Sequence, residues 1–319
     1  MKHSLVLIFL ILAFQACKKT PSVSDAVKKV DVNVKIDRFD SVFAQASPDD
    51  LPKLKHDYPF LFSRKYPDSI WFQKMRDTLQ QQLNAETEKA FSDFSQEKQD
   101  LVLFFKHLKY HFPNFRPPRI VTVVSNVDYR NKVIVTDSIM LLALDTYLGK
   151  NHRFYQGISK YISQNLSADQ ILPDVAAEYA KKYIYQPQRK TLLDEMIYYG
   201  KILYFKDIML PLVPDADKMG YTQQQLEWAQ ANESEIWRYF IAREMLYDTD
   251  SSLPGRFINP APFSKFYLEL DNQSPGRLGQ YIGWQIVRSY MKNNTVDLHK
   301  MLETSPDEIF KNSKFKPRK

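Results

Sequence analysis

The stretch LLDEMIYYGKILYF, residues 192–205, has apolar side chains at the three- and four-residue spacing of one helix face. Its apolar stripe consists of Leu192, Leu193, Met196, Ile197, Leu203 and Tyr204. A second face carries Asp194, Tyr198 and Lys201, of which the first two are one helical turn apart. The pattern predicts a core helix with one polar, solvent-facing side.

The same stretch matches the frame of a zinc-peptidase helix, but its metal ligands are exchanged. Such a helix carries H-E-x-x-H, in which two imidazoles one turn apart bind zinc and the glutamate activates a water. Here Asp194 and Tyr198 occupy the two histidine positions, and Glu195 occupies the position of the base. An aspartate can ligate zinc, whereas a neutral tyrosine phenol is a poor ligand, since zinc prefers His and Cys. We therefore expect a degenerate zinc helix with no metal and no catalytic residue.

The remaining histidines offer one further pair with metal-ligand spacing. His107 and His111 lie one turn apart in the predicted helix EKQDLVLFFKHLKYHF. No third ligand is evident near them, and histidines at a helix C-terminus also suit the helix dipole. The sequence has no G-x-S-x-G nucleophile elbow, no P-loop and no G-x-G-x-x-G motif. It predicts no metal site and no cofactor.

The composition is that of a globular, well-packed chain. Its 319 residues are 44% hydrophobic and 25% charged, and they include only 8 glycines against 21 phenylalanines and 19 tyrosines. The net charge of +7 is modest for this length, and no run of Arg and Lys is longer than a pair. These features argue against a nucleic-acid partner.

The N-terminus has the pattern of an export signal. Lys2 and His3 precede an apolar run that ends before the single cysteine, Cys17, in the context LAFQAC. Residues 1–16 are predicted to be a lipoprotein signal peptide, too short for a stable membrane span, and Cys17 is the predicted lipidation site. An unlipidated signal peptide with an incidental cysteine is the alternative.

The segment that follows the cysteine is polar and predicts a tether. Residues 17–30 contain Pro21 and no apolar periodicity, so they are expected to form a lipidated flexible linker. Lys18 and Lys19 follow Cys17, without an aspartate that would favour inner-membrane retention and without an acidic cluster for surface export. We expect the body to be anchored to the outer membrane and to face the periplasm.

The body, residues 31–319, is predicted to be a single helix-rich domain of the α+β class with a small sheet. Apolar residues alternate over 30–36, as in a half-buried strand. The β-branched runs at 119–126 and 132–149 predict a hairpin or adjacent strands around NVDYRN. Helical patterns cover 68–112, 174–185, 188–209, 222–247, 279–292 and 304–311.

Two stretches near the C-terminus are distinctive. A Pro/Gly/Asn-rich loop at 254–277 is long enough to be functional rather than a mere connector. It leads into SPGRLGQYIGWQIVRSYM, residues 274–291, in which Gly283 allows another helix to approach closely beside Trp284. For this helix a tightly packed core position is favoured over a ligand site.

Several of these segments together resemble the gliding motility lipoprotein family GldB. The resemblance rests on the lipobox and on IDRFD, YLG, LLDEMIYYGKILYF, LPLVPDADKMGYT, INPAPFSKFY and SPGRLGQYIGWQIVRSYM, which span nearly the whole chain. It implies an outer-membrane-associated lipoprotein needed for gliding, with a zincin-like body related to predicted zinc-dependent peptidases. It carries over no catalytic residue, because Asp194 and Tyr198 stand where the peptidase histidines would be.

Two classes of function remain open at this point. The first is a non-catalytic component or assembly factor of the motility and secretion apparatus, which reuses the former active-site cleft to bind other proteins of the gliding machinery. The second is a hydrolase in which Glu195 and another carboxylate, Glu233 or Glu235, act without zinc. Because a peptidase should keep its metal ligands, the sequence favours the first class.

Overall fold

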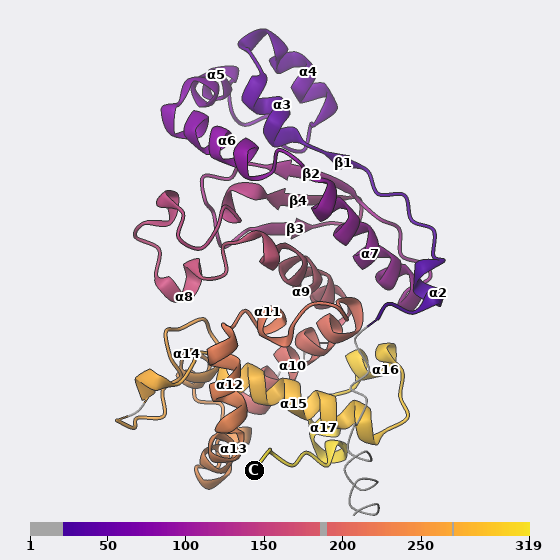
Figure 1. The fold of residues 1–319 in the computed structure, drawn as a ribbon, viewed down its shortest axis with the longest axis vertical. Coiled ribbons are helices and arrows are strands. Elements are labelled where there is room, and N and C mark those ends of the chain that lie inside the picture. Colours follow the sequence, from indigo (N-terminus) through magenta and orange to yellow (C-terminus); the bar gives the residue numbers. More distant parts are fainter. Residues whose placement is uncertain (1–21, 186–189, 270) are drawn as a thin grey trace, which may run out of the picture.

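The structure is a computed structural model that describes residues 22–185, 190–269 and 271–319 (Figure 1). The predicted signal peptide, residues 1–16, and the predicted lipidation site Cys17 lie outside the described residues. The described chain is α+β and predominantly helical with a small four-stranded sheet, as predicted. The zincin-like relation of this fold stays a prediction.

The sheet joins four short strands in the order β1-β2-β4-β3. They are β1 (Ile36–Asp37), β2 (Arg119–Val123), β3 (Val133–Val135) and β4 (Ile139–Ala143). β1, β2 and β4 are parallel, and β3 pairs antiparallel with β4. Of the two predicted arrangements, adjacent strands are correct and a hairpin around NVDYRN is wrong. Parallel strands such as β2 and β4 cannot be joined by a tight turn and require a crossover connection. The hairpin instead joins β3 to β4. In its turn, Thr136 Oγ1 donates to the Ile139 carbonyl at 2.9 Å.

Each face of the sheet has its own core, because successive strand residues point to opposite faces. Ile120, Met140 and Leu142 belong to the large core together with α7 (Ser95–His111) and α9 (Ile171–Tyr183). Val121 and Leu141 face a smaller core on the other side. That core is covered by α3 (Phe39–Gln45), α4 (Leu51–Asp57) and α5 (Asp68–Arg76), and α6 (Thr78–Ala90) packs on α3 and α5 (Figure 1).

The strand predicted over 30–36 is correct in its alternating burial but wrong in its length. Only the two residues of β1 pair with β2, because β2 itself begins too late to reach the residues before β1. Helix α7 supplies partners for the preceding backbone instead. Lys106 Nζ donates to the Lys28 carbonyl at 2.8 Å, and Lys109 Nζ donates to the Asp31 carbonyl at 2.9 Å.

Part of the predicted tether is folded. α2 (Asp25–Lys28) is a single helical turn capped by the Ser24 side chain, and it packs against α7. Val27 within it is buried. Residues 25–28 therefore belong to the folded body rather than to a flexible linker over 17–30, because a buried apolar side chain and the contacts to α7 hold them.

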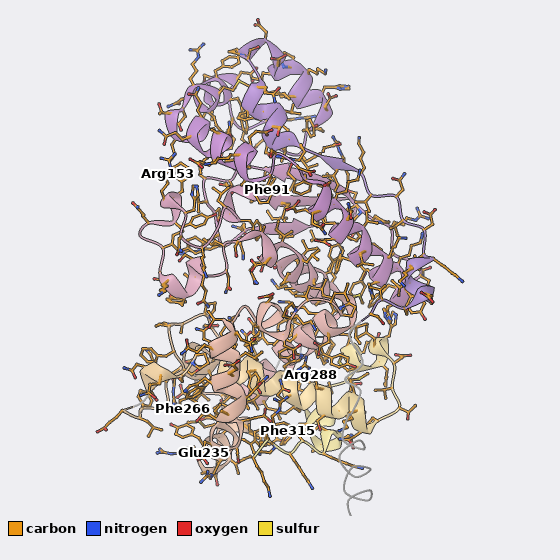
Figure 2. The ribbon with its side chains drawn as sticks, in the orientation of Figure 1. Phe91, Arg153, Glu235, Phe266, Arg288 and Phe315 are labelled. Atoms are coloured by element: carbon orange, nitrogen blue, oxygen red, sulfur yellow. The ribbon has the colours of Figure 1, made fainter. Side chains whose placement is uncertain are left out.

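The helical half of the molecule is built around α10 (Leu192–Met209) and α15 (Leu278–Asn293), below the sheet in Figure 1. Where these helices cross, a Cβ added to Gly283 would lie 1.8 Å from the carbonyl oxygen of Met196, and one added to Gly200 would lie 2.4 Å from the Gly283 backbone. The two backbones therefore touch, and the predicted close approach at Gly283 is confirmed. Both helices are buried over most of their length, and Figure 2 shows side chains filling the space around them.

Shorter elements surround this pair and connect it to the sheet. The other helices are α8 (Lys160–Ser163), α11 (Asp215–Met219), α12 (Gln223–Ala231), α13 (Glu233–Ala242), α14 (Leu253–Phe257), α16 (Leu298–Glu303) and α17 (Pro306–Ser313). Short 3-10 turns are found at Pro48–Asp50, Leu144–Thr146, Arg153–Tyr155, Ala168–Gln170, Met245–Tyr247 and Asp271–Gln273.

Two predicted helices are divided at polar residues that satisfy backbone groups. The pattern over 68–112 forms three helices, and the first break is at Asp77, whose carboxylate accepts from the backbone N–H of Gln80 at 2.7 Å. The pattern over 222–247 breaks at Asn232, whose side-chain amide donates to the carbonyl of Trp228 at 2.9 Å.

Candidate functional site

Asp194 belongs to the cap of α10 rather than to a ligand site. The Asp194 backbone N–H donates to Thr191 Oγ1 at 3.1 Å, and the Thr191 backbone N–H donates to the Asp194 carboxylate at 2.8 Å. This reciprocal pair is a capping box, which satisfies N–H groups at the start of a helix. It also fixes the start of the helix at Leu192, and the predicted start at residue 188 lies outside the described residues.

The other two positions of the zinc frame, Glu195 and Tyr198, are half-buried. Glu195 pairs with Lys190 at 3.8 Å, and the Tyr198 ring packs edge-on against Tyr199. Burial raises the pKa of Tyr198, so its phenol stays protonated and is a poor zinc ligand. In the described part of the chain, no three His, Cys, Asp or Glu side chains gather closely enough to hold a metal ion. The residues of this frame therefore do not fit zinc.

Lys201 contradicts the prediction of a solvent-facing side on this helix. Its side chain is buried, with the residue only 1% exposed. Its Nζ donates to the carbonyl oxygens of Leu302 at 2.8 Å and Thr304 at 2.6 Å. Burial lowers the pKa of Lys201 to about 8. This face of α10 is interior because the end of α16 and the chain after it cover it.

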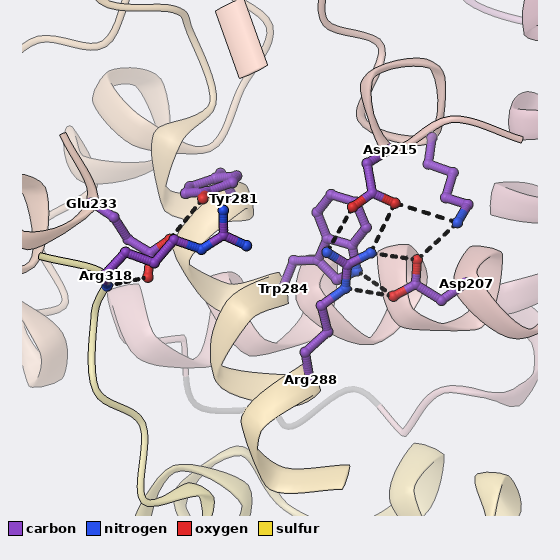
Figure 3. Close-up of polar contacts among 8 residues, drawn as sticks. Asp207, Asp215, Glu233, Tyr281, Trp284, Arg288 and Arg318 are labelled. Carbon is purple, nitrogen blue, oxygen red and sulfur yellow. Dashed lines mark hydrogen bonds and ion pairs between the residues drawn. The ribbon is translucent and has the colours of Figure 1, made fainter. Parts of the chain in front are cut away.

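The two carboxylates considered as partners of Glu195 have other contacts. Glu233 is buried and accepts from the Tyr281 hydroxyl at 2.7 Å and from the Arg318 backbone N–H at 3.0 Å (Figure 3). Glu235, which is labelled in Figure 2, is exposed and pairs with Arg238. The polar partners of Glu195, Glu233 and Glu235 among the described residues are thus different groups, and no hydrogen bond joins these carboxylates into the pair that a zinc-free hydrolase needs.

The histidine pair lies on α7 as predicted but does not converge on a third ligand among the described residues. His107 is buried, and neither of its ring nitrogens has a hydrogen-bond partner there. Burial lowers the pKa of His107 to about 4, and the charge of His111 adds to this effect. The backbone carbonyl of His111 lies 2.7 Å from the ring of His299. His107 is thus a neutral imidazole packed in the core.

The C-terminal end of α10 carries a network of charges (Figure 3). Asp207 accepts from Arg288 Nε at 2.7 Å and from Trp284 Nε1 at 2.9 Å. Asp215 accepts from Arg288 Nη1 at 2.8 Å, and Lys218 Nζ donates to Asp207 at 3.1 Å. Burial alone would lower the pKa of Arg288, but the two carboxylates raise it above its usual value. The network therefore fastens α10, α11 and α15 to one another.

A pocket of about 510 Å³ lies next to this network, between the helical half and the loops that leave the sheet. Its wall includes three of the stretches on which the family resemblance rests. Residues 219–221 come from LPLVPDADKMGYT, residues 260–261 from INPAPFSKFY, and residues 276–277 from SPGRLGQYIGWQIVRSYM. Segments far apart in the sequence thus meet at one cavity, whose volume is typical of a small-molecule site.

Lys206 reaches this pocket from α10 and links it to the charge network. The residue is 8% exposed, and its Nζ donates to the carbonyl of Lys218 at 2.8 Å. No carboxylate of the described chain forms a salt bridge with it. Burial lowers the pKa of Lys206 to about 8, with Asp174 opposing the shift and Arg277 adding to it. The charge of Arg277, which lines the same pocket, therefore disfavours the charged form of Lys206.

Arg277 stands at the start of α15 in a left-handed conformation, with φ of 61°. Its Nη2 donates to the Gly220 carbonyl at 2.8 Å, and its guanidinium lies 5.3 Å from the centroid of the Tyr221 ring. Asn165 Nδ2 donates to the same carbonyl at 3.1 Å. Burial lowers the pKa of Arg277, but arginine keeps its charge at any physiological pH.

Asp174 is the single carboxylate among the described residues that line the pocket, and it is already bound. It accepts from the Tyr147 hydroxyl at 3.0 Å and pairs with Lys132. Among the described residues that line the pocket, Lys206 and Arg277 consequently form no salt bridge with a carboxylate, although the charge of Asp174 acts on both.

A buried aspartate supports the loop that forms the outer rim. Asp145 accepts from the backbone N–H of Ser125 at 2.9 Å and of Val127 at 2.6 Å. These bonds hold Val127 at a φ of 58°, which a β-branched residue rarely adopts. The same loop continues to Tyr129 and Arg130, which line the pocket.

No motif or spacing in the sequence predicted a site at Lys206, Asp207 and Arg277. A lysine in a helix is ordinarily solvated, and only the packing of α11 and α15 shows that Lys206 is buried. One sign was available: α10 is apolar on nearly every side, so a lysine near its C-terminal end has little room to reach water.

Within the described residues, no helix is long and apolar enough to cross a bilayer.

Among curated proteins, the ATP synthase gamma chain of Geotalea daltonii is 25% identical over 121 residues, 36% of this chain and 41% of that protein. The chain spans about two fifths of the length of this relative, so the match assigns no function. No solved structure matches the chain. The family model described as gliding motility protein GldB matches residues 18–317, and the chain therefore belongs to the GldB family of gliding motility proteins.

Proposed function

We propose that this chain is a non-catalytic component or assembly factor of the gliding motility and secretion apparatus, held at the periplasmic face of the outer membrane by lipidated Cys17. Its membership of a gliding motility family supports the motility role. Its partners are then the outer membrane, through the lipid on Cys17, and other proteins of the gliding machinery. Neither nucleic acid nor a metal cofactor takes part.

The capping role of Asp194 is the observation that carries the non-catalytic assignment. A carboxylate that accepts the backbone N–H of its own helix cap at 2.8 Å is engaged in fixing the helix start. Glu195, in the position of a general base, belongs to no cluster of metal-ligating side chains among the described residues, and its ion pair is with Lys190. The helix therefore keeps the frame of a peptidase helix without its chemistry.

The decisive experiment is the replacement of Glu195 by glutamine in gliding cells. Glu195→Gln keeps the size and hydrogen-bonding capacity of the side chain and removes the base, so cells should glide normally at normal protein level. Ile197→Asp, two residues further along the helix, is the matched control that should remove the protein by misfolding. A stable, correctly localised Glu195→Gln protein that does not support gliding would establish the alternative, a hydrolase that uses Glu195.

The membrane anchor is tested separately. Cys17→Ala should move the protein from the membrane fraction to the soluble periplasm, because the acyl chains provide the attachment. If the variant still pellets with outer membranes after a salt wash, the assignment of Cys17 as the anchor is wrong.

A further inference from the structure

The pocket beside Lys206 has an excess of positive charge. Its wall contains four cationic side chains, Arg130, Lys132, Lys206 and Arg277, and one anionic side chain, Asp174. Lys132 and Tyr147 already bind Asp174, and this carboxylate acts on Lys206 and Arg277 without a salt bridge to either, so the described wall keeps a net positive charge. Buried charges in proteins are ordinarily paired, since an unpaired ion loses its hydration without compensation.

Lys201 shows how this fold treats a purely structural lysine. Both Lys201 and Lys206 are buried on α10, and burial lowers the pKa of each to about 8. Lys201 Nζ binds two backbone carbonyls, away from any lining residue of the pocket. Lys206 Nζ binds one carbonyl and lies in the pocket wall, so its ammonium keeps donors for a further partner.

The start of α15 adds to the positive potential. Gly276 and Arg277 line the pocket directly before the first residue of this long helix. The N-terminal end of a helix carries a partial positive charge from its unpaired N–H groups. Arg277 also retains nitrogens beyond the Nη2 that binds the Gly220 carbonyl, so its guanidinium can take an oxyanion.

The neutral part of the wall selects for a hydroxylated ligand. Side-chain amides line the pocket at Gln164, Asn165, Gln170 and Gln225. Tyrosines line it at Tyr129, Tyr161 and Tyr221. Amides both donate and accept hydrogen bonds, and aromatic rings provide flat apolar surface, so together they suit a small molecule with several hydroxyl groups.

We propose that this pocket binds a sugar-sized, hydroxylated molecule that carries an oxyanion, a carboxylate or a phosphate, with the anion against Lys206 and Arg277. The amides and tyrosines of the wall then contact the hydroxylated part. Arg130, on the exposed rim, attracts the anion before it enters. This binding function goes beyond the motility role and does not depend on it.

The test is calorimetric titration of the full-length mature chain in detergent at constant ionic strength. The probes are galacturonate, a sugar carboxylate, glucose 6-phosphate, a sugar phosphate, and the neutral sugars galactose and glucose. At least one acidic sugar should bind at millimolar concentration or below, while the neutral sugars should not. Binding of galacturonate identifies the oxyanion as a carboxylate, and binding of glucose 6-phosphate identifies it as a phosphate. Absence of binding by both acids, or equal binding of the neutral sugars, overturns the proposal.

Variants locate the binding in this pocket. Lys206→Met keeps the length of the side chain and removes its charge, so it should weaken binding by about tenfold or more. Lys201→Met is the matched control on the same helix and should leave the affinity unchanged. An unchanged affinity of Lys206→Met contradicts the proposal. If Lys206→Met does not fold, the variant Arg130→Gln, at an exposed position, takes its place in the titration. Binding that is several-fold weaker than in the wild type supports the proposal, and an unchanged affinity overturns it.

Discussion

At its N-terminal end α10 carries Asp194 and Glu195, and at its C-terminal end it carries Lys206 and Asp207. Asp194 is engaged with Thr191 in the helix cap, and Glu195 lies half-buried with no second carboxylate in contact in the described chain. Lys206, by contrast, borders a pocket of about 510 Å³, and no described carboxylate forms a salt bridge with it. At the end that matches a catalytic frame in sequence, Asp194 forms the helix cap, and at the end without a motif Lys206 lines the pocket for which we propose binding.

The residues of a motif therefore have a chemical role only together with the residues that surround them in the fold. H-E-x-x-H acts because two imidazoles hold a metal, and the glutamate works on a water of that metal. With Asp194 and Tyr198 at the two histidine positions, the same frame offers a good cap residue and a half-buried tyrosine. At the other end, α11 and α15 enclose Lys206 and turn an ordinary helical lysine into a buried cation.

The largest effect is expected from Ile197→Asp in the structural end of α10. Ile197 is 0% exposed, so the variant places an unpaired carboxylate in the large core. We expect a loss of about 4 kcal/mol or more in the free energy of unfolding, measured by urea denaturation. Leu212→Asp, at an exposed position just after α10, should change it by about 0.5 kcal/mol or less. Similar values for both variants would contradict a structural role for this end of the helix.

A direct comparison of the two lysines is expected to give the next largest effect. Lys201→Met removes the donor to the Leu302 and Thr304 carbonyls and should cost about 2 kcal/mol in the free energy of unfolding. Lys206→Met removes one hydrogen bond together with an unneutralised buried charge, so it should cost less. If Lys206→Met is the more destabilising of the two in parallel urea titrations, Lys206 is structural and the contrast between the two ends fails.

His107 extends the comparison to the other residues that had metal-ligand spacing. His107→Leu should raise the free energy of unfolding by about 1 kcal/mol at pH 7, because it removes two buried ring nitrogens that have no hydrogen-bond partner in the described part of the chain. The folded-state pKa of His107, about 4, lies below the unfolded value, so the unfolded chain binds the proton more readily. Stability is therefore lost as the pH falls from about 6.5 to about 4, by up to about 3 kcal/mol.

The pH profile distinguishes this role of His107 from a metal-binding role. Thermal unfolding of the His107→Leu variant should lose less stability than the wild type between pH 6.5 and 4.5. His56→Gln, at an exposed position, should follow the wild-type profile. Stabilisation of the wild type by added zinc, absent in His107→Leu, would instead assign a metal to His107 and His111.

The smallest effects are expected at Glu195 and on treatment with a chelator. Glu195→Gln should change the free energy of unfolding by about 0.5 kcal/mol or less, because Glu195 is half-buried and only loosely paired. EDTA should leave the melting temperature unchanged, since no metal is expected to be linked to folding. Elemental analysis that finds close to one zinc per chain would contradict both expectations and return the zinc frame to a catalytic role.

Local sequence patterns predicted the elements of the fold better than their connections. The alternation over 30–36 correctly gave the buried side of the segment, and the apolar pattern of 279–292 closely located α15. The pairing of β4 with β2 was open, because parallel pairing depends on residues that are distant in sequence. The break at Asn232 was missed, since an asparagine within a helical pattern carries no clear stop signal by itself.

The candidate site was less predictable than the fold. The sequence pointed to Asp194, Glu195 and Tyr198, which share a helix and can be read from spacing alone. Lys206 and Arg277 are in different segments, and their common surroundings arise only when α10, α11 and α15 pack together. Long-range packing of this kind leaves no local periodicity for sequence reasoning to detect.

The contact between Gly200 and Gly283 has a consequence for how this chain can change during evolution. Each glycine lies fewer than two helical turns from a pocket cation, with Lys206 following Gly200 and Arg277 preceding Gly283, about 9 Å along each helix. An inserted or deleted residue in either interval would rotate its cation by about 100° around the helix, because the glycine contact holds the crossing point in place. Changes in the length of these intervals would therefore separate the pocket from the helix pair that supports it, an effect that no single substitution within them produces.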